Sequence, residues 1–443
     1  MILRRLFFFL IGVNVTLGLG AQELSDSPVS LQACIDLGLE NNPSVQAIRN
    51  REEIARNNHS VEPFLPSLRG TSRYNISRTK SNRTLASGSS QEFTNARSET
   101  FNAGLSFSWR LFDGLGMFAR YEESKSRLSL SEINTRSAVE NLVVSISTRY
   151  YEILVQQTRV DAAAKTLDLS RERFRIVGEK VNLGSASGMD LQQARLDFNA
   201  DSSYLVRQKE QLKNSYIQLN RLMNADLSNH SYVSDTITLG LPLVLGDLEV
   251  ATENNNTTLI ASSIGVRQSL YGLRQARAAR YPTFDLVSGY TYSRSESPAS
   301  SMTFSDSKGL NYGFEASLNI FDGFLINRNI KNASIELENR NLSYEEARVE
   351  VMAELHTLYN TYLNNLLMVD FERQNVEVSR ANLDLALERY DLGALSGLGF
   401  REFQISYLNA VDRSLTALYQ AKVIELSLLV LSGQMDEFVM RIR

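Results

Sequence analysis

The residues that most often bind metals or transfer protons in enzymes are few and scattered in this chain. The three histidines, His59, His230 and His356, lack carboxylate or cysteine partners at ligand spacing, so the sequence predicts no metal site. Gly114-Leu115-Gly116 and Gly397-Leu398-Gly399 are glycine-rich fragments, but neither has the third glycine of a dinucleotide-binding fingerprint in a strand-to-helix unit. We therefore expect no cofactor, and an enzyme is the least favoured class of function.

The composition narrows the possibilities further. Of the 443 residues, 43% are hydrophobic and 22% are charged, which is typical of a folded chain and not of a disordered or helical membrane protein. The formal net charge of −4 gives no basic excess, so we expect no nucleic-acid partner. Cys34 is the only cysteine, which excludes an internal disulfide.

The N-terminus has the layout of a secretory signal peptide. Arg4-Arg5 is followed by an apolar run over residues 6–13 and then by small residues. This pattern predicts a signal peptide over residues 1–21. The alternative is an uncleaved N-terminal anchor, although the apolar run is shorter than a membrane span.

The sequence contains two copies of one unit. Phe112-Asp113-Gly114 returns as Phe321-Asp322-Gly323, an offset of 322 − 113 = 209 residues, and residues 183–188 return at the same offset as residues 392–397. An internal repeat has to be recognised before a fold is assigned. We place the first copy at residues 22–225, a linker at 226–254, the second copy at 255–435 and a C-terminal tail at 436–443.

Each copy contains two segments in which apolar residues alternate with small or polar ones, as in β-strands. We place these strands at residues 67–78, 100–112, 283–293 and 309–321, with polar loops over 78–97 and 293–308. Strands of about ten residues can cross a membrane at a tilt, but a soluble sandwich of two sheets fits the alternation equally well. A membrane barrel needs about eight strands, so a membrane assignment requires several chains.

Two very long helices follow the strands in each copy. We place them at residues 114–182, 188–224, 323–391 and 398–432. The apolar stripe expected to be buried on the third of them includes Leu342, Val349, Leu355, Tyr359 and Leu363. A helix of about 65 residues is roughly 100 Å long, so it must lie against other helices. These helices alone favour an antiparallel coiled-coil rod, but a closed wall of helices is also possible.

Proline and aspartate mark the joints between strands and helices. Pro66 and Pro282 precede strands, where proline ends a helix and favours extended backbone. Asp113 and Asp322 follow strands, and we expect them to be N-caps of the long helices.

The doubled unit, its Phe-Asp-Gly joints and its helix turns together resemble the TolC-type family of outer-membrane efflux and secretion channels. The most specific stretches are residues 183–194 and 389–396, which resemble the repeated tip signature of that family. The resemblance implies an α+β membrane protein that acts as a homotrimer. Each chain would give four strands to a 12-stranded β-barrel in the outer membrane, continuous with a 12-helix α-barrel across the periplasm. The linker at residues 226–254 would then form part of an equatorial collar.

The resemblance also implies two kinds of functional residue. Asp384, with Asp391 nearby, maps to the stretch where some members place an acidic pore constriction. The alternative is that Asp384 is a solvated carboxylate on a helix face without a role. The helix-turn tips would bind a periplasmic adaptor, although the same residues are also ordinary turn formers. The tip residues are Gly184, Ser187, Asp190, Gly393 and Ser396. One departure from the family pattern is Gly397 and Gly399 just past the second tip, followed by Phe400-Arg401-Glu402-Phe403 where the first copy has Leu191-Gln192-Gln193-Ala194.

The leading hypothesis is a passive exit duct of a tripartite efflux or type I secretion system in a Gram-negative outer membrane. Its partners would be outer-membrane lipid, a periplasmic adaptor and an inner-membrane pump of the RND, ABC or MFS type. A periplasmic coiled-coil rod without a channel is the alternative. The sequence does not separate drugs, metals and proteins as cargo, although the absence of a Met-rich or His-rich lining weighs against dedicated copper or silver export.

Overall fold

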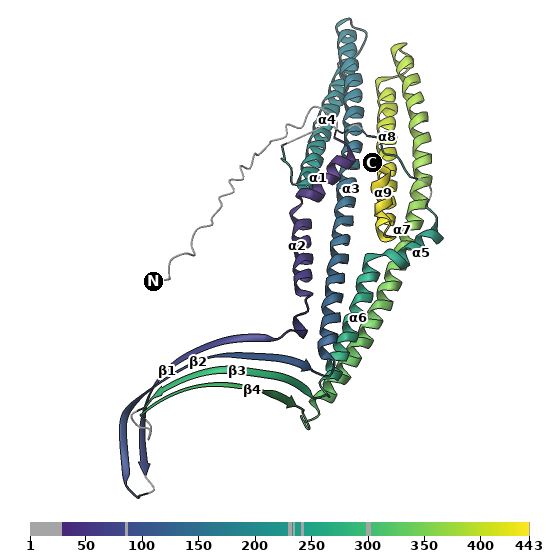
Figure 1. Cartoon of the computed structure of the whole chain (residues 1–443). Helices are drawn as coiled ribbons and strands as arrows, with labels where there is room; N and C mark the ends of the chain where they lie inside the picture. The colour runs from purple at the N-terminus through teal and green to yellow at the C-terminus, as the bar shows by residue number, and fades with distance from the viewer. Residues whose placement is uncertain are drawn as a thin grey trace, which may run out of the picture.

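The computed structural model describes residues 29–84, 87–228, 233, 235–240, 243–297 and 303–442. These residues form a sheet at one end of the molecule and a set of long helices that run away from it (Figure 1). The expected signal peptide at residues 1–21 lies outside the described residues, as do parts of the expected linker at 226–254.

The same order of elements occurs twice along the chain. The first copy contains α1 (Leu31–Asn41), α2 (Pro43–Asn58), the short 3-10 helix η1 (Glu62–Phe64), β1 (Ser67–Thr84), β2 (Ser90–Phe112), α3 (Gly116–Asn182) and α4 (Gly188–Met223). The second copy contains α5 (Leu245–Asn255), α6 (Thr257–Ala278), β3 (Thr283–Glu296), β4 (Phe304–Ser317), α7 (Leu325–Asp391) and α8 (Gly397–Leu431), and α9 (Met435–Ile442) follows it.

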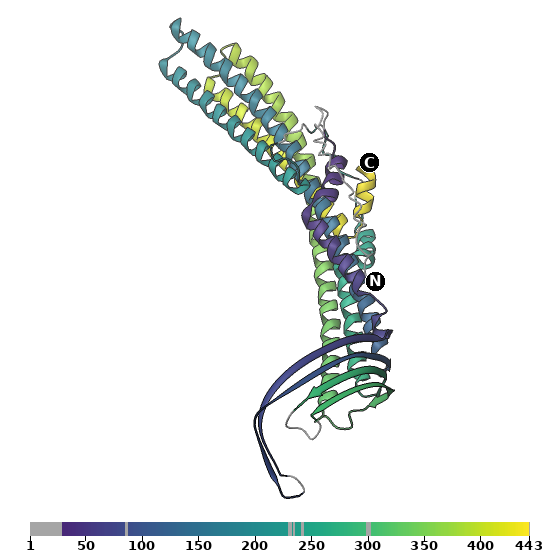
Figure 2. The same cartoon turned by 60° about the vertical axis from the view of Figure 1, so that its left-hand side comes forward.

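The four strands form one antiparallel sheet in the order β1-β2-β3-β4. The central β2–β3 pair therefore joins the two copies, so neither copy has a sheet of its own. Figure 2 shows that the sheet is curved, with β1 and β4 at its two edges.

The strands depart from the bounds expected from the sequence. The expected loop over residues 78–97 is wrong, because β1 and β2 continue pairing up to Thr84 and Ser90. This part of β2 has no second neighbour, since β2 pairs with β3 only from Glu99 onward. A two-stranded ribbon that packs against nothing needs no apolar face, so it lacks the alternation that identifies a half-buried strand. β4 also ends earlier than expected, at Ser317.

Each strand-to-helix joint turns through two consecutive left-handed residues. Gly114 and Leu115 have φ values of 70° and 69°, and Gly323 and Phe324 both have φ of 65°. At Gly114 an added Cβ would lie 2.4 Å from the carbonyl oxygen of Ala278, so both the backbone conformation and the close approach require glycine.

The aspartates at these joints cap the long helices from outside the N-cap position. The helices begin at Gly116 and Leu325, so the expected N-cap assignment of Asp113 and Asp322 is corrected by two residues. The carboxylate of Asp113 still accepts a hydrogen bond from the backbone N–H of Met117 at 2.9 Å, and that of Asp322 accepts one from Ile326 at 2.8 Å. Each satisfies an N–H group that has no partner within the helix.

Two asparagines show how closely the copies match away from the sheet. Asn42 caps α2 and Asn256 caps α6 through their side-chain oxygens. Their side-chain amides donate to the carbonyl oxygens of Leu222 and Leu431, in each case at 2.8 Å. Each asparagine therefore fixes the short helical pair of its copy to the end of the returning long helix.

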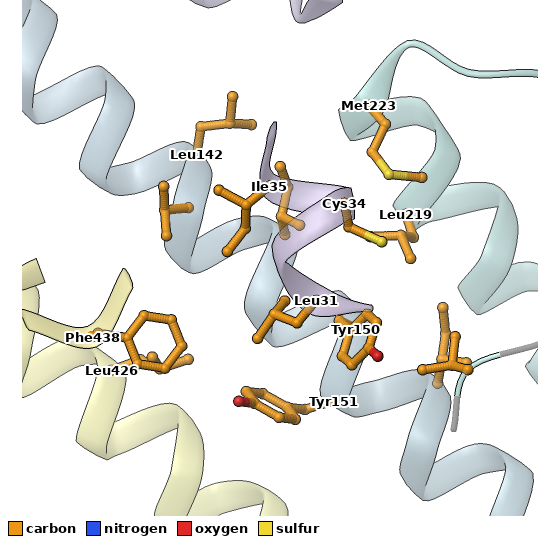
Figure 3. Close-up of a cluster of buried hydrophobic side chains, with 14 of the residues drawn as sticks. Leu31, Cys34, Ile35, Leu142, Tyr150, Tyr151, Leu219, Met223, Leu426 and Phe438 are labelled. Carbon is orange, nitrogen blue, oxygen red and sulfur yellow. The ribbon is translucent and has the colours of Figure 1, made fainter. Parts of the chain in front are cut away.

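The largest buried cluster lies where α1, α3, α4, α8 and α9 meet (Figure 3). Ile35, Ile146 and Tyr150 are completely buried there. The hydroxyl of Tyr150 lies within hydrogen-bond distance of the Val29 carbonyl and of the Asp235 carboxylate. Burial in this cluster raises the pKa of the Cys34 thiol to about 12, which keeps the thiol protonated and unreactive.

The expected C-terminal tail at residues 436–443 is instead largely helical, because α9 covers part of this cluster. Met435 and Phe438 are buried, and the ammonium of Lys422 lies 5.5 Å from the Phe438 ring centroid. A short segment without long apolar periodicity gives little sequence signal for a helix, which explains the error. Helix α8 has the length and hydropathy of a membrane span, but a core helix passes the same test, and α8 packs against α3 and α7.

Candidate functional site

The two faces of the sheet differ in chemistry. Directly opposed residues of antiparallel strands share a face, so the register sorts the side chains. One face carries Leu68, Tyr74, Phe101, Leu105, Phe107, Trp109, Leu286, Tyr290, Tyr292, Leu310, Tyr312 and Phe314. The other carries Arg69, Thr71, Arg73, Asn102, Ser106, Ser108, Arg110, Asp285, Thr291, Ser293, Asn311 and Glu315.

The apolar face is exposed and has the height of a membrane. Tyr312 and Phe314 are 81% and 82% exposed, and Leu310 is 68% exposed, so the described part of the chain leaves them uncovered. On β2 this face runs from Phe101 to Leu111, which is 111 − 101 + 1 = 11 residues. At about 3.4 Å per residue and a tilt of about 45°, this stretch spans about 25 Å, the height of the apolar band of a membrane barrel.

Aromatic side chains gather where the sheet meets the helices. The ring centroids of Phe112 and Phe284 are 6.0 Å apart, and those of Phe321 and Phe324 are 5.6 Å apart. The indole N–H of Trp109 donates to the backbone carbonyl of Phe64 at 2.9 Å. Aromatic rings with a polar contact are typical of the boundary between lipid and water.

The two edges of the sheet are open in a single chain. β1 pairs only with β2, and β4 pairs only with β3, among the strands that the structure describes. An open edge leaves backbone N–H and C=O groups that lipid cannot hydrogen-bond. A polar face, an exposed apolar face and two open edges together indicate one segment of a barrel wall.

The tips of the long helices lie at the end of the molecule opposite the sheet (Figure 1). Gly184 and Gly393 end α3 and α7 with φ values of 72° and 73°, which explains glycine at both positions. Ser187 and Ser396 then cap α4 and α8, accepting backbone N–H bonds from Asp190 and Gly399, each at 3.1 Å. Four of the expected tip residues therefore have a structural role in the turn.

The fifth, Asp190, completes a reciprocal cap at the first tip only. Its carboxylate accepts hydrogen bonds from the backbone N–H and the hydroxyl of Ser187 at 3.1 and 2.7 Å, which lower the pKa of Asp190. Gly399 stands at the equivalent position, 399 − 190 = 209 residues later, and supplies no carboxylate. The Ser-x-x-Asp spacing is a helix-capping signal that was overlooked when Ser187 and Asp190 were expected to bind an adaptor.

The most exposed apolar side chains at the tips were missed in the sequence. Leu183 and Met189 are 82% and 81% exposed at the first tip, and Leu392 and Leu398 are 83% and 72% exposed at the second. They occupy equivalent positions in the two copies. Leucine and methionine are so common in helices that only their position beside a turn glycine could have singled them out.

The expected constriction residues lie on one exposed stripe of α7. Asp384 and Asp391 are both exposed and seven residues apart, which is about two helical turns or 10 Å. Asp370 and Glu377 extend the same seven-residue spacing and are also exposed. We call these four carboxylates the acidic stripe. Asp370 is paired with Arg373 at 2.7 Å, whereas Asp384 and Asp391 make no ion pair within the described residues.

Buried polar contacts join the two helical hairpins behind the tips. The guanidinium of Arg401 on α8 donates to both carboxylate oxygens of Asp201 on α4, at 2.6 and 2.7 Å. The side-chain amide of Gln404 donates to the Thr166 carbonyl and the Ser170 hydroxyl on α3, at 3.0 and 3.1 Å. Within α3 and α4, Arg173 pairs with Asp197 at 2.8 Å.

The second long hairpin leaves apolar side chains uncovered. Of the stripe expected to be buried on α7, Leu355 is completely buried, but Leu342, Val349 and Leu363 are 63%, 69% and 42% exposed. The prediction that these three side chains are buried is therefore wrong for a single chain. Helical periodicity shows that a side chain needs a neighbour, but it does not show whether that neighbour belongs to the same chain. No group of three or more potential metal ligands occurs among the residues that the structure describes.

Comparisons of the sequence and of the structure both find similar outer-membrane proteins. A family model described as outer membrane efflux protein matches residues 34–225 and 250–434. The chain is similar to the outer membrane protein TolC of Escherichia coli, at 20% identity over 98% of this chain and 87% of that protein. It is also similar to the alkaline protease secretion protein AprF of Pseudomonas aeruginosa, at 22% identity over 90% of this chain and 84% of that protein. Among solved structures, the Campylobacter jejuni CmeC outer membrane channel has a TM-score of 0.77 and 20% identity, covering 91% of this chain and 85% of that one.

Proposed function

Because the chain belongs to the outer membrane efflux protein family, we propose that three copies form a passive exit duct across the outer membrane and periplasm. The observation that carries this proposal is the two-faced sheet with two open edges. Its apolar face fits lipid, its polar face fits a water-filled lumen, and its edges fit the sheets of two further copies. A periplasmic rod without a channel is not favoured, because a rod has no use for an exposed apolar sheet.

The duct would extend from the cell outer membrane of a Gram-negative bacterium into the periplasm. The aromatic rings at the strand-to-helix joints would lie at the inner boundary of the lipid, and the long helices would form the periplasmic wall. Residues 1–21 would direct export as a cleaved signal peptide, and residues 226–254 would belong to a collar around the helices.

The duct would work with a periplasmic adaptor and an inner-membrane pump in an efflux or type I secretion system. A family model named for efflux and a relative named for protease secretion both match this chain, so the proposal includes small molecules and proteins as cargo. The same reasoning leaves the RND, ABC and MFS types of pump open. Co-purification with a crosslinked adaptor would identify the system.

The acidic stripe would face the lumen and make the periplasmic end select for cations. The support is that Asp384 and Asp391 are exposed and unpaired, so threefold symmetry would give two rings of three carboxylates. We expect Asp384→Asn with Asp391→Asn to lower the cation preference measured in planar bilayers. Asp168→Asn, an exposed carboxylate on α3, is the control and should leave selectivity unchanged. Equal selectivity in all three proteins would remove Asp384 and Asp391 from the pore.

The tips would bind the adaptor through their exposed apolar side chains. Ser187→Trp or Ser396→Trp would be poor probes, because both serines cap helices. We expect Leu183→Ser with Leu392→Ser to reduce adaptor crosslinking and export while the trimer stays intact, since both side chains are more than 80% exposed and pack little against their own chain. Export at the normal rate would show that the adaptor binds elsewhere.

The proposed duct is tested by outer-membrane fractionation together with conductance. The full chain should stay with outer membranes after a salt wash and should open discrete conductance steps in planar bilayers. A protein released by salt, or one without conductance, would contradict the proposal.

A further inference from the structure

Charged side chains on the polar face of the sheet are paired on the inner strands and unpaired on the edges. Arg110 of β2 donates from Nε and Nη2 to the two carboxylate oxygens of Asp285 on β3, at 2.9 and 3.2 Å. Arg69 and Arg73 of β1 and Glu315 of β4 are exposed, and the described residues give them no ion pair. The two edges of the sheet therefore carry opposite charge on the same face.

Glu315 is also in an unfavourable position within one chain. It lies directly opposite Asp285 in the β3–β4 ladder, so two carboxylates face each other. Like charges directly opposed across strands destabilise a sheet. Arg110 already binds both oxygens of Asp285, so it leaves Glu315 without a cation. The remaining neighbour position of Glu315 is the open edge of β4.

We propose that Glu315 forms an ion pair across the seam between two copies of the chain, with an arginine on β1 of the next copy. The primary partner is Arg69, and Arg73 is its neighbour on the same face. The proposal rests on the proposed function, because it requires that several copies close one barrel. It adds which residues join the copies and in which register.

The register follows from the slope of the sheet. Ser67, the first residue of β1, lies in one row with Ser108, Val287 and Gly313. β4 ends at the same end of the sheet at which β1 begins, and Gly313 is 317 − 313 = 4 residues from the last residue of β4. This row of directly opposed residues is therefore displaced by four residues, relative to the strand ends, over the three strand pairs from β1 to β4. One further pair with the mean displacement of these three pairs adds between one and two residues, and three copies must share one shear.

The faces of the strands restrict this register to two solutions. A residue on the polar face must pair with another on the polar face, so the row through Glu315 reaches either Arg69 or Thr71 of the next copy. In the first solution Glu315 lies directly opposite Arg69. In the second it lies opposite Thr71, with Arg69 and Arg73 on the two diagonals, about 7 Å away and within the reach of an arginine side chain. Both solutions give Glu315 a cation.

Disulfide crosslinking distinguishes the two registers. We would combine Glu315→Cys with Arg69→Cys or with Thr71→Cys in the full chain and oxidise intact outer membranes. One of these pairs should give covalent trimers, whereas Glu315→Cys with Ser77→Cys, farther along the same face, should not. Single-cysteine variants control for the native Cys34. Intact trimers without crosslinks at either position would overturn the inference and leave the proposed duct standing.

A charge exchange tests whether the contact is an ion pair. Glu315→Arg should lower the temperature at which detergent-solubilised trimers dissociate, because it places cations opposite each other. Exchanging Arg69, the primary partner in either register, for Glu in the same chain should raise that temperature again. A dissociation temperature unaffected by Glu315→Arg, or not raised by the exchange, would contradict the ion pair. If wild-type protein formed no trimer at all, the proposed duct itself would fail.

Discussion

The two long hairpins come from the same repeated unit, yet only the first is well covered within its own chain. Helices α3 and α7 both contain 67 residues, but 20 residues of α3 are buried and only 8 of α7. The reason lies in their neighbours, because α3 contacts α1, α2, α4, α6 and α8, whereas α7 contacts α5, α6 and α8. The second copy therefore keeps an apolar surface that no described part of its own chain buries.

The same asymmetry appears at the tips. The first tip has a complete capping box, while the second has only the Ser396 cap and a glycine at the matching position. Both in the long helices and at the tips, the first repeat is thus more fully packed and capped within its own chain than the second. The differences lead to three predictions.

The largest effect is expected from charging the uncovered surface of α7. Leu342→Glu with Val349→Glu should abolish the trimer. Each apolar side chain buried between neighbouring chains contributes about 1.5–3 kcal/mol, and a buried unpaired carboxylate costs more. The measurement is the mass of the protein in detergent. The matched control, Leu342→Met with Val349→Ile, should stay trimeric. Normal trimers in the charged variant would mean that this surface is not an interface.

A smaller but still large loss of stability is expected where α8 contacts α4 of the first repeat. Arg401→Ala should lower stability by about 3–5 kcal/mol, because it leaves the buried Asp201 carboxylate without its cation. Arg373→Ala on α7 is the control, since its pair with Asp370 is exposed and contributes little. Thermal unfolding would compare the two variants. Equal effects would show that the Arg401–Asp201 contact between the two repeats of one chain is no stronger than a surface ion pair.

The smallest effect is expected at the helix caps. Ser187→Ala should destabilise the first turn of α4 by about 1 kcal/mol, and Ser396→Ala should cost α8 somewhat less, because its cap lacks the reciprocal bond. Amide hydrogen exchange in the first turns of α4 and α8 measures this difference. Asp190→Ala should bring the first tip to the level of the second. Identical exchange in all variants would show that Asp190 adds nothing to the cap.

Patterns that arise within one chain could be predicted from the sequence. Alternation on β2 and β3 identified the strands, and the offset of 209 residues identified the duplicated helices. The ribbon beyond Arg78 escaped prediction because it packs against nothing and carries no alternation. Helix α9 was not predicted, because a short amphipathic segment at the end of a chain is hard to distinguish from a tail. The structure shows that Phe438 of this helix is buried in the core.

The candidate site was harder to predict for a different reason. Leu342 and Val349 have the spacing of core residues, but no described part of the chain covers them. Ser187 and Asp190 were correctly located at a tip, yet their side chains are used by the cap. Spacing alone does not separate a residue that holds a turn from one that binds a partner. The exposed leucines beside the turns became apparent only from their exposure.

The central claim is that one chain supplies a third of a closed wall. The most direct test is the native mass of the full chain extracted from outer membranes in mild detergent. We predict a single species containing three chains, because the open edges of β1 and β4 and the uncovered surface of α7 each require a neighbour. A stable, folded monomer that still conducts ions across a bilayer would contradict the account.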